Sequence, residues 1–408
     1  MRFEDSGFAP VIKKNLASMG FRRPTDIQFK AIPPILKGED VLAIAQTGTG
    51  KTAAFVIPVV NNLLKEKNTG GIRCLVMVPT RELGLQIAGV FEEVSKDTGL
   101  KTLCVYGGVE QDPQIRGLAK GTDILVATPG RMFDLASQGF IRLDQVKVLI
   151  LDEADHMLDL GFINDIRQLV SKLPKRRQTL FFSATIDHGI KKLAYSMVRD
   201  AIRIQISPKD PVSKNIDHFV TFIEMDDKRF FLERIIREHP ESKILVFVRT
   251  KVRAERVGAA LERVEIKSIT MHGDKDQKER EQALGKFRKG EINILIATDV
   301  TARGIDIPNV EYVINYDLPE KAENYVHRVG RTGRATKRGI AISFCSEGEK
   351  PVLEEIQSYL EREIEVLKIS KKEYAETIDL STEGPKDWRK LIEEAEREEE
   401  KRRKKKKG

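Results

Sequence analysis

Short apolar runs recur along most of the chain, and each is followed by a few polar residues and then by a helical stretch. The runs are rich in Val, Ile and Leu without alternating polar residues, which indicates strands that are buried on both faces. Strands of this kind that alternate with helices predict a parallel sheet covered on both sides. The first series is VLAIA at 41–45, CLVMV at 74–78, TLCVY at 102–106, DILVA at 123–127, VLILD at 148–152 and TLFF at 179–182. The second series is ILVFV at 244–248, KSITM at 267–271, NILIA at 293–297, YVINY at 312–316 and GIAISFC at 339–345.

The two series predict an α/β fold made of two tandem, doubly wound parallel-sheet domains. The length of 408 residues suits two domains of this kind. We expect the first domain at residues 1–206, a linker with two prolines at 207–214, the second domain at 215–370 and a charged C-terminal extension at 371–408. No further strand is expected after about Glu349. Open parallel sheets bind ligands at the carboxyl ends of their strands, and both halves carry their unusual polar residues there.

Composition excludes several other classes of protein. No apolar run approaches the roughly 20 residues of a membrane-spanning helix, and the acidic start of the chain lacks the apolar core of a signal peptide. The three cysteines, Cys74, Cys104 and Cys345, are odd in number and have no CxxC spacing, which excludes a disulfide framework and a zinc site. We therefore expect a cytoplasmic protein that does not associate with membranes.

A phosphate-binding loop is predicted at residues 45–52, AQTGTGKT, between a strand and a helix. Its glycines let backbone N–H groups surround phosphates, and the helix N-terminus adds partial positive charge. Lys51 is expected to reach the β and γ phosphates, and the Thr52 hydroxyl to bind Mg²⁺. Ala45 replaces the first glycine of the general motif, which is tolerable where that position does not need a positive φ. ATP and Mg²⁺ are thus the expected ligands.

Gln28 has two interpretations. Residues 25–28, TDIQ, form a capping box, in which Gln28 only bonds the backbone N–H of Thr25. Alternatively, the Gln28 amide pairs with the N6 donor and N7 acceptor of adenine while Phe21 stacks on the ring. The P-loop downstream favours the adenine interpretation.

Acidic residues end the most apolar strand, in the sequence DEAD at 152–155. Beside a P-loop, an acidic residue at a strand end holds Mg²⁺ through water, and its neighbour orients or deprotonates the attacking water. We assign Asp152 to Mg²⁺ and Glu153 to the water, and we expect Asp155 to couple to the SAT turn at 183–185. The alternative is that these acids only cap the following helix.

A stretch rich in arginine and glycine, YVHRVGRTGR at 325–334, distinguishes the second half. Three arginines interleaved with glycines make a poor solvated helix face, because glycine destabilises a helix by about 1 kcal/mol relative to alanine. The second half has no P-loop, so we expect Arg331 and Arg334 to act as arginine fingers on a phosphate held by the first half. Such fingers change rates by about 10³–10⁵-fold, and this site is complete only when the domains close.

In this order, the motifs resemble those of the DEAD-box RNA helicases of superfamily 2, over roughly residues 3–370. The matching stretches in the first half are Phe3 with GFRRPTDIQ at 20–28, AQTGTGKT at 45–52, PTREL at 79–83, Gly107 with Gly108, TPGR at 128–131, DEAD at 152–155 and SAT at 183–185. In the second half they are VFVRT at 246–250, HGDKDQKER at 272–280, ATDVTARGID at 297–306 and HRVGRTGR at 327–334. Ala45 is the usual residue of this family. The compact core and short basic tail are similar to those of bacterial members of the RhlE type.

The resemblance implies two RecA-like domains, with ATP in the cleft between them and single-stranded RNA across both. The predicted ATP site comprises Phe21, Gln28, Gln46, Thr47, Gly48, Thr49, Gly50, Lys51, Thr52, Gly304 and Asp306. Catalysis is assigned to Lys51, Asp152, Glu153, Arg331 and Arg334, with Thr52 and Asp152 at the metal. Coupling residues are Asp155, Ser183, Thr185, His327 and Arg328. The implied RNA contacts are Pro79, Thr80, Arg81, Gly107, Gly108, Thr128, Pro129, Arg131, Arg249, Gly273, Gln277, Arg280 and Thr298.

The predicted function is RNA-stimulated ATP hydrolysis coupled to local, non-processive unwinding of RNA duplexes by domain closure. Glycines, hydroxyls and arginines suit sugar-phosphate contacts, so no base specificity is expected. One alternative is an ATP-gated RNA clamp or scaffold with incidental unwinding. Another is a DNA-directed translocase of superfamily 2, against which DEAD and Gln28 with its upstream aromatic argue. Expected partners of this monomer are single-stranded RNA and short duplexes, with proteins of ribosome assembly or RNA decay as further candidates.

Basic charge is concentrated at the C-terminal end. The chain has 70 Lys and Arg against 62 Asp and Glu, a net charge of +8, and the run KRRKKKK at 401–407 contributes seven of these, leaving +1 elsewhere. We predict that this run tethers RNA without sequence preference, the alternative being a disordered, solubilising end. Trp388 is expected to anchor the preceding segment by packing, not to stack on a base.

Overall fold

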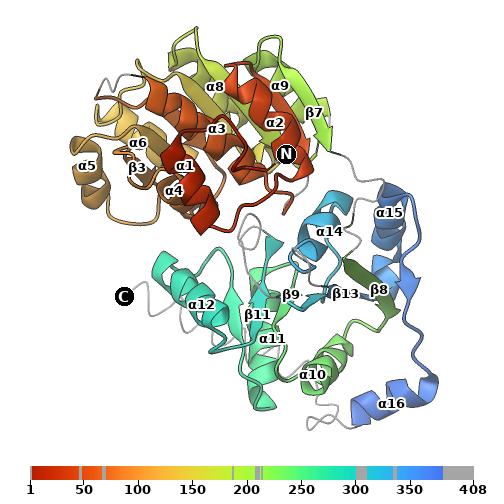
Figure 1. Cartoon of the computed structure of the whole chain (residues 1–408). Coiled ribbons are helices and arrows are strands. Elements are labelled where there is room, and N and C mark those ends of the chain that lie inside the picture. Colours follow the sequence, from red (N-terminus) through yellow and green to blue (C-terminus); the bar gives the residue numbers. More distant parts are fainter. Residues whose placement is uncertain are drawn as a thin grey trace, which may run out of the picture.

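Two domains lie one above the other in the computed structural model of the chain (Figure 1). The structure describes residues 2–45, 48–66, 70–185, 188–206, 212, 215–299, 310–333 and 338–379. In the second domain, α12 (Gln277–Lys289) and α14 (Ala322–Val329) lie on the side that faces the first domain. The predicted linker, Trp388 and the basic tail lie outside the described residues, apart from Val212.

The first domain is built on a seven-stranded parallel sheet in the order β3-β4-β2-β5-β6-β1-β7. Its strands are β1 (Val41–Ala45), β2 (Cys74–Met77), β3 (Thr102–Val105), β4 (Ile124–Ala127), β5 (Val148–Leu151), β6 (Gln178–Ser183) and β7 (Ile202–Ile206). Its helices are α1 (Pro10–Ser18), α2 (Asp26–Leu36), α3 (Lys51–Lys65), α4 (Arg81–Val94), α5 (Asp112–Ala119), α6 (Pro129–Ser137), α7 (Ala154–Asp159), α8 (Ile163–Lys172) and α9 (His188–Met197).

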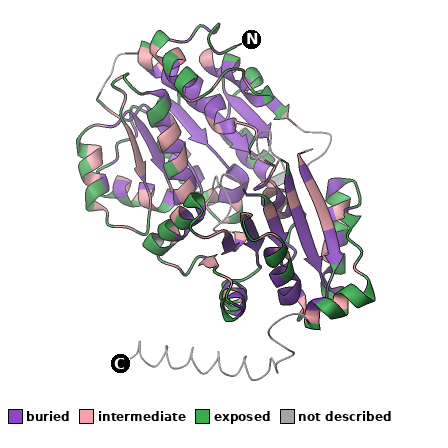
Figure 2. Cartoon of the chain, turned by 60° about the horizontal axis from the view of Figure 1, so that its bottom comes forward, coloured by how far each residue is buried: buried purple, intermediate pink, exposed green. Residues whose placement is uncertain are grey.

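Both faces of this sheet are buried, as the unalternated apolar runs predict. Along β1, Val41 and Ala43 pack with α1 to α4 on one face, whereas Leu42 and Ile44 pack with α6 to α9 on the other. The inner strands β4, β2, β5, β6 and β1 are buried throughout and the strands of the sheet are accordingly mostly purple in Figure 2, whereas the helices carry many of the exposed green positions. The prediction of a doubly wound parallel sheet is therefore confirmed.

The second domain repeats this architecture, with a parallel sheet in the order β10-β11-β9-β12-β13-β8-β14. Its strands are β8 (Ile216–Phe222), β9 (Ile244–Phe247), β10 (Ile269–Met271), β11 (Ile294–Ala297), β12 (Tyr312–Asn315), β13 (Gly339–Cys345) and β14 (Glu365–Val366). Besides α12 and α14, the helical elements are α10 (Lys228–Glu238), α11 (Lys251–Arg263), η1 (Glu347–Glu349), α15 (Lys350–Leu360) and α16 (Lys371–Asp379). Two apolar cores again lie on opposite faces of the sheet.

Three strands near the sheet edges were not among the predicted runs. β7 ends the first sheet and is half exposed, and β8 in the second sheet contains Asp217 and His218, so neither is a continuous apolar run. The expectation of no strand after Glu349 is wrong, because β14 pairs with β8 at the edge of the second sheet. Both residues of β14 are exposed, so it has no apolar signature. Residues 371–379 form α16, which packs on α10 with a Phe231–Tyr374 ring contact.

No helix among the described residues is long and apolar enough to cross a membrane. The three cysteines are free thiols. Burial raises the pKa of Cys104 to about 12 and that of Cys345 to about 11, so both stay protonated near neutral pH. Within the described part of the chain, no group of three or more His, Cys, Asp or Glu residues could hold a metal ion.

Candidate nucleotide and RNA sites

The strand order of the first sheet separates the predicted ATP residues from the predicted RNA residues. β5, β6 and β1 are adjacent, and their carboxyl ends lead to the DEAD sequence, the SAT turn and the P-loop. β3, β4 and β2 are adjacent at the other end of the sheet, and the implied RNA contacts follow them. These contacts are Gly107 and Gly108 after β3, Thr128, Pro129 and Arg131 after β4, and Pro79, Thr80 and Arg81 after β2.

The second sheet makes the same separation. Gly273 follows β10, Thr298 follows β11 and Arg249 follows β9, which are three adjacent strands at one end of that sheet. His327 and Arg328 lie on α14, which follows the central strand β12. In each domain, the predicted RNA contacts therefore follow one group of adjacent strands, and the residues predicted to act at the nucleotide or in coupling follow other strands.

The P-loop glycines adopt the backbone conformation that the motif requires. Gly48 has φ +82° and Gly50 has φ +93°, a left-handed region that favours glycine. Ala45 ends β1 and is not among the residues with positive φ, which explains why alanine is tolerated there. Gln46 and Thr47 lie outside the described residues, and Thr49, before α3, and Thr52, its second residue, are partly buried.

Lys51 begins α3 with a buried ammonium group. It is 6% exposed, and its Nζ has no hydrogen-bond partner among the described residues. A buried, unpartnered ammonium is costly in free energy unless an anion is close. The N-terminus of α3 and this ammonium together favour a bound phosphate.

The capping-box interpretation of Gln28 is confirmed, and Gln28 also reaches the P-loop. Its Oε1 accepts a hydrogen bond from the Thr25 backbone N–H at 3.0 Å, while its Nε2 donates to the Gly50 carbonyl at 3.1 Å. A Cβ on Gly50 would lie 2.5 Å from that Nε2, so the close approach requires glycine. Phe21 is partly buried and packs edge-on against Phe3 at 5.9 Å, and Phe3 itself is buried in the core.

The acidic pair after β5 is buried and its two members have opposite pKa shifts. Burial raises the pKa of Asp152 to about 7, although Lys51 partly opposes this. Burial would also raise the pKa of Glu153, but the close approach of the His156 side chain and the charges of His156, Lys51 and Arg331 outweigh it and lower the pKa to about 2. Glu153 has φ +52°, an unfavourable conformation for a non-glycine residue that is typical of functional sites.

Asp155 contacts the SAT turn through hydrogen bonds, and its role in coupling stays a prediction. Its Oδ2 accepts hydrogen bonds from the backbone N–H groups of Ala184 and Thr185 at 3.1 and 3.2 Å, and from the Thr185 hydroxyl at 3.3 Å. Ser183 is fully buried at the end of β6.

The arginines of the second domain separate into different environments. Arg331 is 2% exposed, and its charge helps to lower the pKa of Glu153 in the other domain. Arg328 instead lies inside its own domain, where it contacts Asp299 at 2.5 and 2.8 Å. His327 lines a cavity between the domains together with Asp155. Predicted residues outside the described part of the chain are Gly304, Asp306 and Arg334.

Helix N-termini and arginines form the predicted RNA edge of the first domain. Thr80 and Thr128 are the N-cap residues of α4 and α6, and Pro129 is the first residue of α6. Gly107 and Gly108 are exposed. Arg131 donates to the Val109 carbonyl at 2.7 Å, which fixes the loop that contains these glycines.

Two arginine–glutamate dipeptides pair reciprocally across the domain boundary on the RNA edge. Arg81 on α4 pairs with Glu281 on α12, and Glu82 on α4 pairs with Arg280 on α12 at 3.4 Å. The Arg81 guanidinium also lies over the Tyr106 ring at 4.0 Å. Two of the predicted RNA-contacting arginines are therefore already paired with carboxylates of the opposite domain. The side chain of Gln277, at the start of α12, is not among those described.

Sequence reasoning missed several of these partners. His156 Nδ1 lies 3.5 Å from Glu153 Oε2, a contact that the i, i+3 spacing on a helix could have indicated. Lys321 pairs with Asp159 of the other domain at 2.7 Å. No sequence motif indicates this pair or the pairing of Glu281 with Arg81.

Comparison with known proteins identifies the family of both domains. A family model described as DEAD/DEAH box helicase matches residues 25–193, and one described as helicase conserved C-terminal domain matches residues 227–336. The chain is 41% identical over 367 residues to the DEAD-box ATP-dependent RNA helicase RhpA of Helicobacter pylori, which covers 90% of this chain and 74% of that protein. The chain belongs to the DEAD-box ATP-dependent RNA helicases.

Further members of this family are similar over most of the chain. The ATP-dependent RNA helicase RhlB of Shewanella amazonensis is 40% identical, covering 90% of this chain and 85% of its own. The structure of S. cerevisiae Dbp5 bound to RNA and ADP BeF3 matches with a TM-score of 0.82 at 31% identity, over 92% of this chain and 97% of that one. The two sheets are therefore the tandem RecA-like domains of a DEAD-box ATPase. The likeness to RhlE-type members stays a prediction.

Proposed function

We propose that this helicase hydrolyses ATP between its two domains when RNA is bound, and that domain closure separates short RNA duplexes locally without base specificity. The observation that carries the proposal is electrostatic. Arg331 of the second domain lies close enough to Glu153 of the first that its charge helps to lower the pKa of that carboxyl group. An arginine in this position can stabilise the charge that develops on a transferred phosphoryl group, as an arginine finger does.

The first domain has the groups needed for ATP and Mg²⁺. The buried Lys51 ammonium supports binding of the β and γ phosphates, and Thr52 and Asp152 are the residues that would hold Mg²⁺. When bound, Mg²⁺ neutralises negative charge on the phosphates. Glu153 is ionised near neutral pH, so it can accept a hydrogen bond from the attacking water and orient it.

The Gln28 amide supports recognition of adenine. A glutamine amide has two N–H donors and two acceptor lone pairs. The contacts to Gly50 and Thr25 use one of each, which leaves one donor and one acceptor. This remainder complements the N7 acceptor and N6 donor of adenine. The capping and adenine interpretations of Gln28 are therefore compatible.

RNA is proposed to bind across the ends of β3, β4 and β2 in one domain and of β10, β11 and β9 in the other. The threonine N-caps, exposed glycines and arginines there suit contacts to phosphate and sugar, which position a strand without reading its sequence. Contacts to the 2′-OH would favour RNA over DNA. Proteins of ribosome assembly or RNA decay remain the proposed further partners of a monomer.

Steady-state ATP hydrolysis with and without single-stranded RNA tests this function. We expect stimulation by RNA and weak stimulation by DNA of the same sequence. Arg331→Ala should abolish RNA-stimulated turnover while ATP still binds. The matched control is Arg338→Ala, an exposed arginine of the same domain, which should leave turnover unchanged. Full activity of Arg331→Ala would refute the proposed finger.

The clamp alternative gains support from the ion pairs between the domains. Arg81–Glu281, Arg280–Glu82 and Lys321–Asp159 all join the two domains. A clamp would release nucleotide slowly and displace little of a short duplex strand. Measuring strand displacement and nucleotide release in the same samples distinguishes the two functions.

A further inference from the structure

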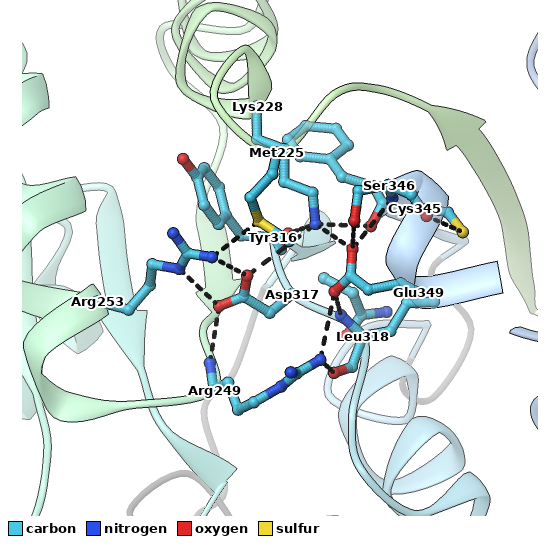
Figure 3. A network of polar contacts seen from close by, with 12 residues as sticks. Met225, Lys228, Arg249, Arg253, Tyr316, Asp317, Leu318, Cys345, Ser346 and Glu349 are labelled. Carbon is cyan, nitrogen blue, oxygen red and sulfur yellow. Dashed lines mark hydrogen bonds and ion pairs between the residues drawn. The ribbon is translucent and has the colours of Figure 1, made fainter. Parts of the chain in front are cut away.

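A polar network, mostly buried, surrounds Arg249, one of the proposed RNA contacts of the second domain (Figure 3). Lys228, the first residue of α10, is 0% exposed and donates hydrogen bonds to the Tyr316 carbonyl at 2.8 Å and to Glu349 Oε2 at 2.5 Å. The same Oε2 accepts from the Ser346 backbone N–H and hydroxyl at 3.0 and 2.8 Å. Glu349 Oε1 accepts from the Leu318 backbone N–H at 3.1 Å. Both oxygens of this buried carboxylate are thus satisfied.

The network holds Arg249 at both ends of the residue. The backbone N–H of Arg249 donates to Asp317 Oδ2 at 3.0 Å. Its Nη2 is 3.4 Å from both the Leu318 carbonyl and Glu349 Oε1. These contacts hold one side of the guanidinium. Because the side chain is 39% exposed, its other side remains accessible to solvent at the proposed RNA edge.

The same segment also contacts Arg328, one of the predicted coupling residues. The Asp317 carbonyl accepts a hydrogen bond from Arg328 Nη1 at 2.6 Å. Arg328 in turn pairs with Asp299, the residue after Thr298. Asp317 and Leu318, two consecutive residues, therefore connect Arg249 with Arg328 through hydrogen bonds.

Stability alone gives little reason for such a network. Replacing a buried ion pair by apolar residues of similar volume is often neutral or stabilising, because burial of the two charges cancels their attraction. A fully hydrogen-bonded buried network instead fixes the geometry of its members. We therefore expect the network to matter mainly for the position of Arg249, the member that reaches the proposed RNA site.

We propose that Glu349 and Asp317 are positioning residues for RNA binding, which hold Arg249 toward the RNA backbone and tie it to the segment that anchors Arg328. This inference rests on the proposed RNA contact of Arg249. It assigns a role to two acidic residues that are not among the proposed contacts to RNA or nucleotide.

Glu349→Gln tests the inference by RNA titration of the ATPase of the full-length protein. We expect the RNA concentration for half-maximal stimulation to rise about tenfold, while the KM for ATP and the kcat at saturating RNA change less than twofold. Glu233→Gln is the matched control, because Glu233 is a buried acid on α10 that pairs with Arg237 and not with Arg249. It should leave the half-maximal RNA concentration unchanged.

The decisive measurement is the double variant with Arg249→Ala. If Glu349 acts through Arg249, Glu349→Gln adds no further change in an Arg249→Ala background. An equal tenfold change in both backgrounds would overturn the inference, as would an unchanged half-maximal concentration in Glu349→Gln. Wild-type protein without RNA stimulation would instead refute the proposed function itself.

Asp317→Asn provides a second route should Glu349→Gln not fold. It removes the charge next to Arg249 and Arg253 but keeps the backbone carbonyl that contacts Arg328. We expect the same rise in the half-maximal RNA concentration without a change in the KM for ATP. A rise in the KM for ATP alone would count against the assigned role.

Discussion

Glu153→Gln gives the sharpest test of the catalytic arrangement, because it replaces one oxygen and leaves the shape of the side chain. The drop in the pKa of Glu153 from 4.5 to about 2 corresponds to about 3 kcal/mol of net favourable interaction with its charge. The amide loses this interaction with His156, Lys51 and Arg331. It also loses the ability to accept a proton from water, which typically contributes about 10²–10⁴-fold to a rate.

We therefore expect the single-turnover rate of ATP hydrolysis at saturating RNA to fall about 10²–10⁴-fold. ATP and RNA should still bind, since Glu153 is not among the groups proposed to hold either. The measurement is quenched-flow hydrolysis, with nucleotide and RNA binding determined separately by fluorescence. The control is Glu92→Gln, an exposed glutamate on α4, which should hydrolyse ATP normally.

The pH dependence of the same pair of proteins adds a second test. The folded-state pKa of Glu153 lies below its unfolded value, so its charge stabilises the fold above about pH 4.5 and this contribution is lost as the pH falls toward 2. Glu153→Gln should thus be less stable than wild type near pH 7, by up to about 3 kcal/mol, and the difference should shrink below pH 4.5. Hydrolysis within threefold of wild type in Glu153→Gln would show that the role assigned to Glu153 is wrong.

Other parts of the molecule allow three further predictions. Lys51→Ala should lose ATP binding, because no other described group of the P-loop supplies a positive charge; equilibrium titration with a fluorescent ATP analogue measures this. Deleting residues 397–408 should weaken RNA binding and flatten its salt dependence, with little effect on the ATPase rate at saturating RNA. For seven charges, the slope of log K against log[salt] should change by at most about five, and an unchanged slope would refute the tether. Glu82→Gln combined with Glu281→Gln should tighten RNA binding at low salt and steepen the slope of log K against log[salt] by at most about 1.4. In wild type, Arg81 and Arg280 must leave these two carboxylates before they can bind phosphates, and in the double variant they need not. Binding that weakens in that double variant would contradict the proposed competition.

The sequence was most informative where function depends on a short continuous stretch. The P-loop, the DEAD sequence and the SAT turn each follow a buried apolar strand, and the contact of Asp155 with Thr185 follows from two such stretches at adjacent strand ends. Gln28 shows the limit of this reasoning. Its capping role is local, but its contact with Gly50 joins residues that are 22 positions apart.

Contacts between distant parts of the chain could not be predicted. Lys228 and Glu349 are 121 residues apart, and Arg81 and Glu281 are 200 apart. Lys, Glu and Arg are common on solvent-exposed surfaces, so the sequence does not mark these four residues as paired. Their partners become apparent only once the helical segments that carry them pack together. β14 escaped prediction for another reason, since a two-residue edge strand with exposed side chains has no periodicity.

The position of β6 has a consequence for substitutions remote from any ligand. This strand lies between β1, which leads to the P-loop, and β5, which leads to the acidic pair, with Ser183 opposite Ile44 and Phe181 opposite Leu151. A change in the packing of Phe181 or Phe182 would shift the turn after β6 relative to both neighbours at once. We expect such a variant to hydrolyse ATP more slowly without a matching loss of ligand affinity, a defect that equilibrium affinity measurements would overlook.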